Sequence, residues 1–168
     1  MKKRKIITAA VSAASVLMFS GFLGKTVSAN TTVNRYYFPE FSGRHDWVPL
    51  NGRAAVPTKG LEGRAWTVPD SGTEVYELLN PNTWDTLLTT SPFEANQVSK
   101  AGWLNIVSGS SVSLKWAFHS GGSVSIYRLY NPDAGKHFYT ASTFEKNSLV
   151  SAGWRLESSS VFKALSGV

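Results

Sequence analysis

Residues 126–154, IYRLYNPDAGKHFYTASTFEKNSLVSAGW, decide the fold because the chain contains this pattern more than once. Residues 75–103, VYELLNPNTWDTLLTTSPFEANQVSKAGW, align with them at an offset of 51 without a gap, and 12 of the 29 positions are identical. Such a match is typical of an internal repeat. A third, more divergent copy opens with RYYFPEFSGRHDWVP, residues 35–49, if Phe41 is an insertion. We therefore expect copies at about 35–74, 75–125 and 126–168.

Each of the two clear copies predicts a β-hairpin followed by a short helix. Strands are expected at 76–79 and 126–130, and their partners at 85–89 and 136–140, because Asn-Pro-Asn and Asn-Pro-Asp between them favour a turn. S-x-x-E at Ser91 and at Ser142 is typical of a capping box, in which the glutamate reaches back to the cap amide. Gly102 and Gly153 are expected to end the helices. The first copy lacks this signature, and PTKGLEG, residues 57–63, is expected to form a loop.

Units of 40–50 residues cannot each bury a core, so they must pack on one another. A closed arrangement also removes exposed strand edges. The predicted fold class is mainly β with short helices, three hairpin-based repeats in a closed pseudo-threefold, β-trefoil-like arrangement. An open α+β repeat stack is the alternative.

The first 29 residues predict a secretory signal peptide. MKKRK is followed by an apolar stretch and by Val27-Ser28-Ala29, which is typical of a cleavage site after Ala29. An uncleaved membrane anchor is the alternative. The domain organisation expected is therefore a signal peptide at 1–29 and a single secreted domain at 30–168, without stable membrane insertion after cleavage.

Removal of this segment changes the charge. Five of the 17 Lys and Arg residues and none of the 11 acids lie in residues 1–29, so the remainder carries 12 cations against 11 acids. A near-neutral chain without a basic block disfavours nucleic-acid binding. The chain has no cysteine, which excludes disulfides and thiol chemistry. A monomer is expected.

The third copy resembles a known family. Its YRLYNPDAGKHFYT, capped helix and Ala-Gly-Trp ending are similar to the repeat of the DUF5648 family, which occurs in secreted bacterial and fungal proteins. The second copy departs at six motif positions, where Glu77, Leu79, Trp84, Thr86, Leu87 and Leu88 stand. The resemblance implies a secreted accessory or binding module and implies no reaction.

Several side chains are candidates for ligand binding. His45 and His137 occupy matching positions, where a structural role in the hairpin competes with a binding role. Phe41 and Trp84 are additional aromatic residues at hairpin tips, where flat rings suit sugars unless they fold back onto a neighbouring unit. The predicted ligand-binding set is Phe41, His45, Trp47, Trp84, Asn131, His137 and Tyr139.

A second set is expected in the core. The tryptophans that follow the Gly positions recur, and the phenylalanines of the helices recur with them. The predicted structural repeat core is Trp66, Trp103, Trp154, Phe93 and Phe144. Three histidines without spaced partners do not form a metal-ligand pattern, and no cofactor is expected.

These observations favour a secreted, non-catalytic module that binds a carbohydrate, either a cell-wall glycan or another extracellular polysaccharide. No catalytic motif is present, and no pair of the 11 acids is singled out for glycoside hydrolysis. A small glycan-directed hydrolase and a secreted bacteriocin-like or protein-binding factor remain the alternatives.

Overall fold

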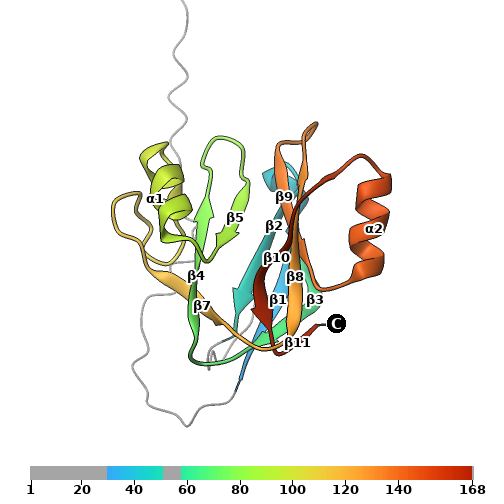
Figure 1. Ribbon diagram of the computed structural model, residues 1–168. Helices are drawn as coiled ribbons and strands as arrows, with labels where there is room; N and C mark the ends of the chain where they lie inside the picture. Colours follow the sequence, from blue (N-terminus) through green and yellow to red (C-terminus); the bar gives the residue numbers. More distant parts are fainter. Residues whose placement is uncertain (1–29, 51–57, 168) are drawn as a thin grey trace, which may run out of the picture.

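The protein is mainly β and consists of several antiparallel sheets flanked by two helices (Figure 1). The structure, a computed structural model, describes residues 30–50 and 58–167. The expected signal peptide and part of the loop expected at 57–63 lie outside the described residues.

The first sheet has the order β11-β3-β1-β2. Its strands are β1 (Thr31–Phe38), β2 (Arg44–Pro49), β3 (Leu61–Val68) and β11 (Ser166–Gly167), and a short 3-10 helix, η1 (Pro39–Phe41), lies in the β1–β2 turn. Thr67 of β3 pairs with Thr32 on one side and with Ser166 on the other. The two ends of the described chain therefore lie in the same sheet.

The second and third sheets contain the other two hairpins. The second has the order β5-β4-β6, with β7 also paired to β4, and the third has the order β10-β8-β9. Their strands are β4 (Thr73–Leu79), β5 (Thr86–Thr89), β6 (Leu104–Asn105), β7 (Trp116–Ser120), β8 (Val124–Asn131), β9 (Lys136–Thr140) and β10 (Arg155–Ala164). The β4–β5 and β8–β9 turns point to the same end of the molecule, at the top of Figure 1.

The turns form as the sequence predicts. The side-chain oxygen of Asn80 accepts hydrogen bonds from the backbone N–H groups of Asn82 and Thr83, and Asn131 Oδ1 accepts from those of Asp133 and Ala134. A left-handed residue lies near the end of the turn in all three hairpins, with φ of 73° at Gly43, 59° at Trp84 and 64° at Gly135. Trp84 thus adopts a conformation that side chains rarely adopt.

Helix α1 (Pro92–Lys100) follows β5, and helix α2 (Thr143–Ser151) follows β9. Ser91 and Ser142 are the N-cap residues, and each hydroxyl accepts a hydrogen bond from the N–H of the glutamate three residues on. Gly102 and Gly153 have φ of 92° and 93° just beyond the helix ends. The expected helices and their ends are confirmed. In the first sheet β3 begins at Leu61, inside the segment expected to be a loop.

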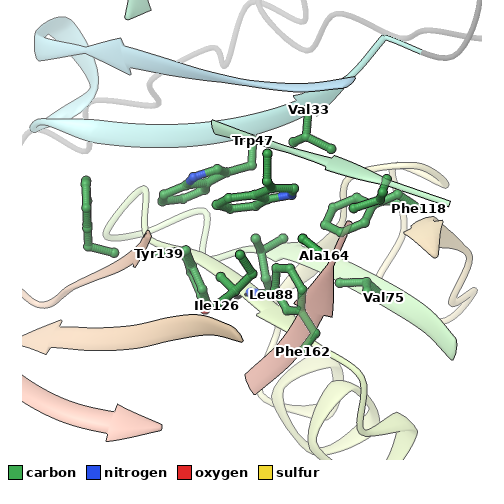
Figure 2. Packing of buried hydrophobic residues seen from close by; sticks show 13 residues of the cluster. Val33, Trp47, Val75, Leu88, Phe118, Ile126, Tyr139, Phe162 and Ala164 are labelled. Atoms are coloured by element: carbon green, nitrogen blue, oxygen red, sulfur yellow. Dashed lines mark hydrogen bonds between the residues drawn. The ribbon is translucent and has the colours of Figure 1, made fainter. Parts of the chain in front are cut away.

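The core lies where the sheets meet (Figure 2). One set of buried pairs lies across adjacent strands, Val33 opposite Trp66, Val75 opposite Phe118 and Ile126 opposite Phe162. Trp66, Phe118 and Phe162 therefore occupy the same place in the three strand pairs. Trp103 and Trp154 occupy a different place, because they directly precede β6 and β10. The sequence alignment that matched Trp66 with Trp154 is therefore corrected.

A second buried set comes from the returning strands of the hairpins. Trp47, Leu88 and Tyr139 occupy matching repeat positions, and all three are 0% exposed. The rings of Trp47 and Tyr139 lie 4.9 Å apart, and the N–H of Leu88 donates a 2.8 Å hydrogen bond to Tyr139 Oη. Residues from all three sheets therefore meet in one core. None of the helices in the described residues is long and apolar enough to cross a membrane.

Candidate functional site

Two arginines at matching positions join the sheets to the helices. Nη1 of Arg35, on β1, lies 3.0 and 3.1 Å from the two carboxylate oxygens of Glu145 on α2. Nη1 of Arg128, on β8, lies at the same two distances from those of Glu94 on α1. Each pair therefore joins a helix to a strand of a different sheet.

The helix caps leave these glutamates available for the arginines. In a complete capping box the glutamate accepts from the N–H of the cap serine. Here the N–H of Ser91 donates to Thr89 Oγ1 and that of Ser142 donates to Thr140 Oγ1, both at 2.9 Å. The threonines take the role expected of the glutamates, so that part of the capping-box prediction is wrong.

A second carboxylate completes each cluster. Arg35 Nε donates a 2.7 Å hydrogen bond to Glu62 on β3, and Arg128 Nε lies 3.0 Å from Glu157 on β10. The acidic neighbours, together with Tyr139, raise the pKa of Arg128, although burial alone would lower it. The guanidinium of Arg128 therefore remains charged, and each arginine contacts two carboxylates.

The cluster around Arg35 borders a pocket between α2 and β3. Its volume is about 510 Å³. Its lining combines the charged group of Arg35, Glu62 and Glu145 with hydroxyl and apolar side chains, including Ser142, Ser148, Phe144 and Leu149. We call this region the α2 groove.

Phe144 lies at this groove and is exposed to 82%, and its counterpart Phe93 on α1 is exposed to 72%. The prediction that both belong to the core is wrong. Ala95 and Ser99 mark the buried face of α1, and Phe93 lies about 200° around the helix from Ala95 at 3.6 residues per turn. The helix geometry thus directs the Phe93 ring into solvent, and Phe144 holds the same position on α2, none of whose described residues is buried.

The histidines are mostly buried. His45 Nε2 lies 3.7 Å from Glu62, a contact that would favour a charged imidazole. Burial nevertheless lowers the pKa of His45 to about 4, and the charge of Arg35 acts in the same direction. Glu62 offers little compensation because it is itself hydrogen-bonded to Arg35. His45 is therefore neutral at pH 7.

Both ring nitrogens of His137 face carboxylates. Nδ1 lies 2.7 Å from Asp85 in the β4–β5 turn of the second sheet, and Nε2 lies 3.2 Å from Glu157 on β10. The backbone N–H of His137 also donates to Asp85 at 2.7 Å. Since both nitrogens have partners and the side chain is only 13% exposed, this arrangement joins two sheets rather than presenting an imidazole to a ligand.

The aromatic residues at the hairpin tips pack on each other. The rings of Phe41 and Trp84 lie 4.8 Å apart, and the guanidinium of Arg44 lies 5.9 Å from the Trp84 ring. Both aromatic side chains are half-buried. The structure thus brings these two predicted binding residues together, as a contact between two hairpins.

The other predicted binding residues lie elsewhere. Trp47 and Tyr139 are 0% exposed and are assigned to the core rather than to a binding surface. Asn131 orients the β8–β9 turn. Of the predicted core residues, Trp66 is 0% exposed, while Trp103 and Trp154 are half-buried, and Trp154 packs edge-on against Phe138.

The α2 groove brings two carboxylates and a guanidinium close to an exposed aromatic ring. Within the described ranges, no group of three His, Asp or Glu residues has a geometry that could hold a metal ion. Glu62 and Glu145 both contact Arg35, and their carboxylate oxygens accept its hydrogen bonds. The groove therefore offers an exposed ring beside fixed hydrogen-bonding groups.

Sequence reasoning missed the α2 groove because its polar residues come from two distant segments, 110 positions apart at Arg35 and Glu145. One signal was present. Phe93 and Phe144 occupy the same position in the two copies, and each is followed by a glutamate, Glu94 or Glu145. The arginines that pair with these glutamates, Arg128 and Arg35, also occupy one common position of the sequence alignment.

The fold and these clusters define a mainly β, disulfide-free protein assembled from antiparallel sheets with helices clamped by arginines. The chain belongs to the DUF5648 family, described as a domain of unknown function, whose profile it matches over residues 54–164. No significant match is found among curated proteins or among solved structures.

Proposed function

We propose that the protein is a non-catalytic module that binds a cell-wall or other extracellular glycan in the α2 groove. The observation that carries this proposal is the exposed ring of Phe144 beside the cluster of Arg35, Glu62 and Glu145. An exposed phenyl ring that does not pack in the core lowers the solubility of a protein. A binding role therefore explains the exposure of Phe144 better than a structural role does.

The groove has the chemistry that sugars need. The C–H face of a pyranose packs on an aromatic ring, while its hydroxyls donate to carboxylates and accept from guanidinium groups. Arg35 is held by two glutamates and by the Phe138 ring, 5.0 Å away. Such preorganised groups lose little side-chain entropy when a ligand binds.

A pull-down on insoluble glycans tests the proposal. We expect the purified protein to be retained on peptidoglycan sacculi, chitin or cellulose, and we expect Phe144→Ala to lower the retention at least tenfold. Val112→Ala is the matched control, because Val112 is 93% exposed but lies outside the groove. A folded wild-type protein that none of these three glycans retains would contradict the proposal.

The proposed function includes export. It rests on the basic and apolar segments of residues 1–29 and on the small residues before Asn30. Amino-terminal sequencing of the protein recovered from the culture medium is expected to begin at Asn30. A protein retained entirely in the cell pellet would contradict export.

We also propose that the sheets form a closed arrangement with pseudo-threefold symmetry. The matched core pairs, the left-handed turn positions and the contact of Trp47, Leu88 and Tyr139 support it. The two arginine–glutamate pairs have the same direction, from the first sheet to α2 and from the third sheet to α1. An experimental structure whose three hairpins are related by rotations of about 120° would establish it.

A further inference from the structure

The groove at α2 has a counterpart at α1. Phe93 and Phe144 are both the second residue of their helix, both are exposed, and each is followed by a glutamate that is paired with an arginine. Besides Phe93 and Glu94, the counterpart contains Arg128 and Glu157. We call this group the α1 cluster.

The two groups agree in geometry and in solvent access. Both arginine–glutamate pairs have separations of 3.0 and 3.1 Å. The side chains of Glu145 and Glu62 are exposed to 32% and 34%, and those of Glu94 and Glu157 are exposed to 33% each. A hydroxyl-rich ligand therefore meets equivalent acceptors beside an equivalent ring in each group.

The strand that borders each group differs. At the α2 groove β3 contributes Gly63 and Ala65, whereas β10 carries Ser158, paired with Arg128, and then Ser159 and Ser160 in the register shift before the pair Phe162–Ile126. Three serines add hydroxyl partners and remove apolar surface. The α1 cluster is therefore related to the α2 groove without being identical to it.

A third copy of the group is not expected. The position that matches Arg35 and Arg128 is occupied by Glu77 in the second sheet, so the charge there is reversed. In residues 30–50 and 58–167 helices capped by S-x-x-E follow only the second and third hairpins. The repeat therefore supplies two groups on one chain.

We infer that the α1 cluster is a second glycan-binding site, so that one chain bridges two glycan strands; this inference rests on the function proposed above. The two helices lie on opposite flanks of the molecule in Figure 1, with the sheets between them. Two separate glycan strands then engage the two sites of one protein molecule.

A sandwich assay tests this inference. The probe is whichever of sacculi, chitin and cellulose retains the wild-type protein, and a fluorescent soluble fragment of the same polymer is added after the protein has bound. We expect the wild type to capture the fragment. Phe93→Ala and Phe144→Ala should each still bind the polymer through the remaining site, more weakly than the wild type, and should capture no fragment because that site is already occupied.

The double variant Phe93→Ala/Phe144→Ala should bind neither form, while Val112→Ala should behave like the wild type. Gel filtration confirms that the protein added is a monomer, and circular dichroism confirms that each variant is folded. Phe93→Gln repeats the test if Phe93→Ala does not fold.

A Phe93 variant that captures as much fragment as the wild type overturns the second site and leaves the proposed function intact. A wild type that binds but captures nothing also overturns it. A wild type that binds none of the three glycans ends both proposals.

Discussion

At the scale of single residues, burial decides the state of the side chains that the sequence singled out. His45 was a binding candidate by its type and its position, and its surroundings make it a neutral core-edge residue. The charged groups around it are Arg35, Glu62 and Glu145 from the same cluster and Lys136 from β9. The type of residue alone could not reveal that His45 is neutral, because its protonation depends on its burial and on the charged groups beside it.

The lowered pKa of His45 predicts that stability falls in mild acid. The unfolded histidine binds a proton below its ordinary pKa of 6.5, whereas the folded one does so only near pH 4. The contribution of neutral His45 to the free energy of unfolding is therefore fully present above pH 6.5. It is lost as the pH falls from 6.5 to about 4, and the loss does not grow further below that pH. By pH 5 the loss is on the order of 2 kcal/mol.

Urea unfolding at pH 7.5 and pH 5 measures this effect. We expect His45→Gln to reduce the difference between the two free energies of unfolding, whereas His119→Gln, on β7, should keep the wild-type difference. An unchanged difference in His45→Gln would show that other groups cause the acid sensitivity.

Tyr139 gives a second prediction at this scale. Its hydroxyl is fully buried, burial raises its pKa well above the usual range, and it accepts the N–H of Leu88. Tyr139→Phe leaves that buried N–H without its acceptor, which should lower the free energy of unfolding by about 1–3 kcal/mol. Tyr37→Phe is the control because Tyr37 is exposed. Equal stability of Tyr139→Phe and the wild type would exclude a structural role for this bond.

At the scale of elements, the sequence predicts local structure well and long-range partners poorly. The hairpins, the cap serines and the terminal glycines follow from turn and capping preferences that act over a few residues. The hydrogen-bond partners of Glu94 and Glu145 could not be predicted from such local preferences. Thr89 and Thr140 satisfy the cap amides, and the arginines that the glutamates bind come from other sheets. The exposure of Phe93 follows from the orientation of α1, which packing across the sheets determines.

The arginine–glutamate pairs should stabilise the attachment of the helices. A double-mutant cycle with Arg128→Gln and Glu94→Gln is expected to give a coupling energy of about 1–2 kcal/mol, because the two side chains are only 15% and 33% exposed. The same cycle on Lys59 and Glu40, of which Lys59 is 83% exposed, should give no measurable coupling. Equal coupling in the two cycles would mean that burial does not strengthen the Arg128 pair.

At the scale of the whole molecule, the repeat in the sequence predicts that the sheets share one core, and the mainly β fold is confirmed. The alignment of the first copy failed beyond its hairpin. The strand β3 pairs with β1 through Trp66 opposite Val33, without an intervening helix in the described residues to fix the alignment. Spacing alone therefore matched the wrong tryptophans.

A shared core predicts that the three sheets unfold together. Leu88 is fully buried and lies beside Tyr139, so Leu88→Ala should lower the free energy of unfolding by about 2–5 kcal/mol. Tryptophan fluorescence, which reports on the tertiary surroundings of the six tryptophans, and circular dichroism, which reports on the strands, should show the same transition in wild type and variant. Two separate transitions would show that the units fold independently.

The position of β11 brings the two ends of the described chain close to each other. Thr32 and Ser166 both pair with Thr67, so the two ends of the described chain are about two strand spacings, or roughly 10 Å, apart. A circular permutant that joins residue 30 to residue 167 by a short glycine-serine linker and begins at Val112, in an exposed loop, should therefore fold with a circular dichroism spectrum like that of the natural order. In such a protein the pairing of the strands, rather than the position of the two chain ends, specifies the architecture.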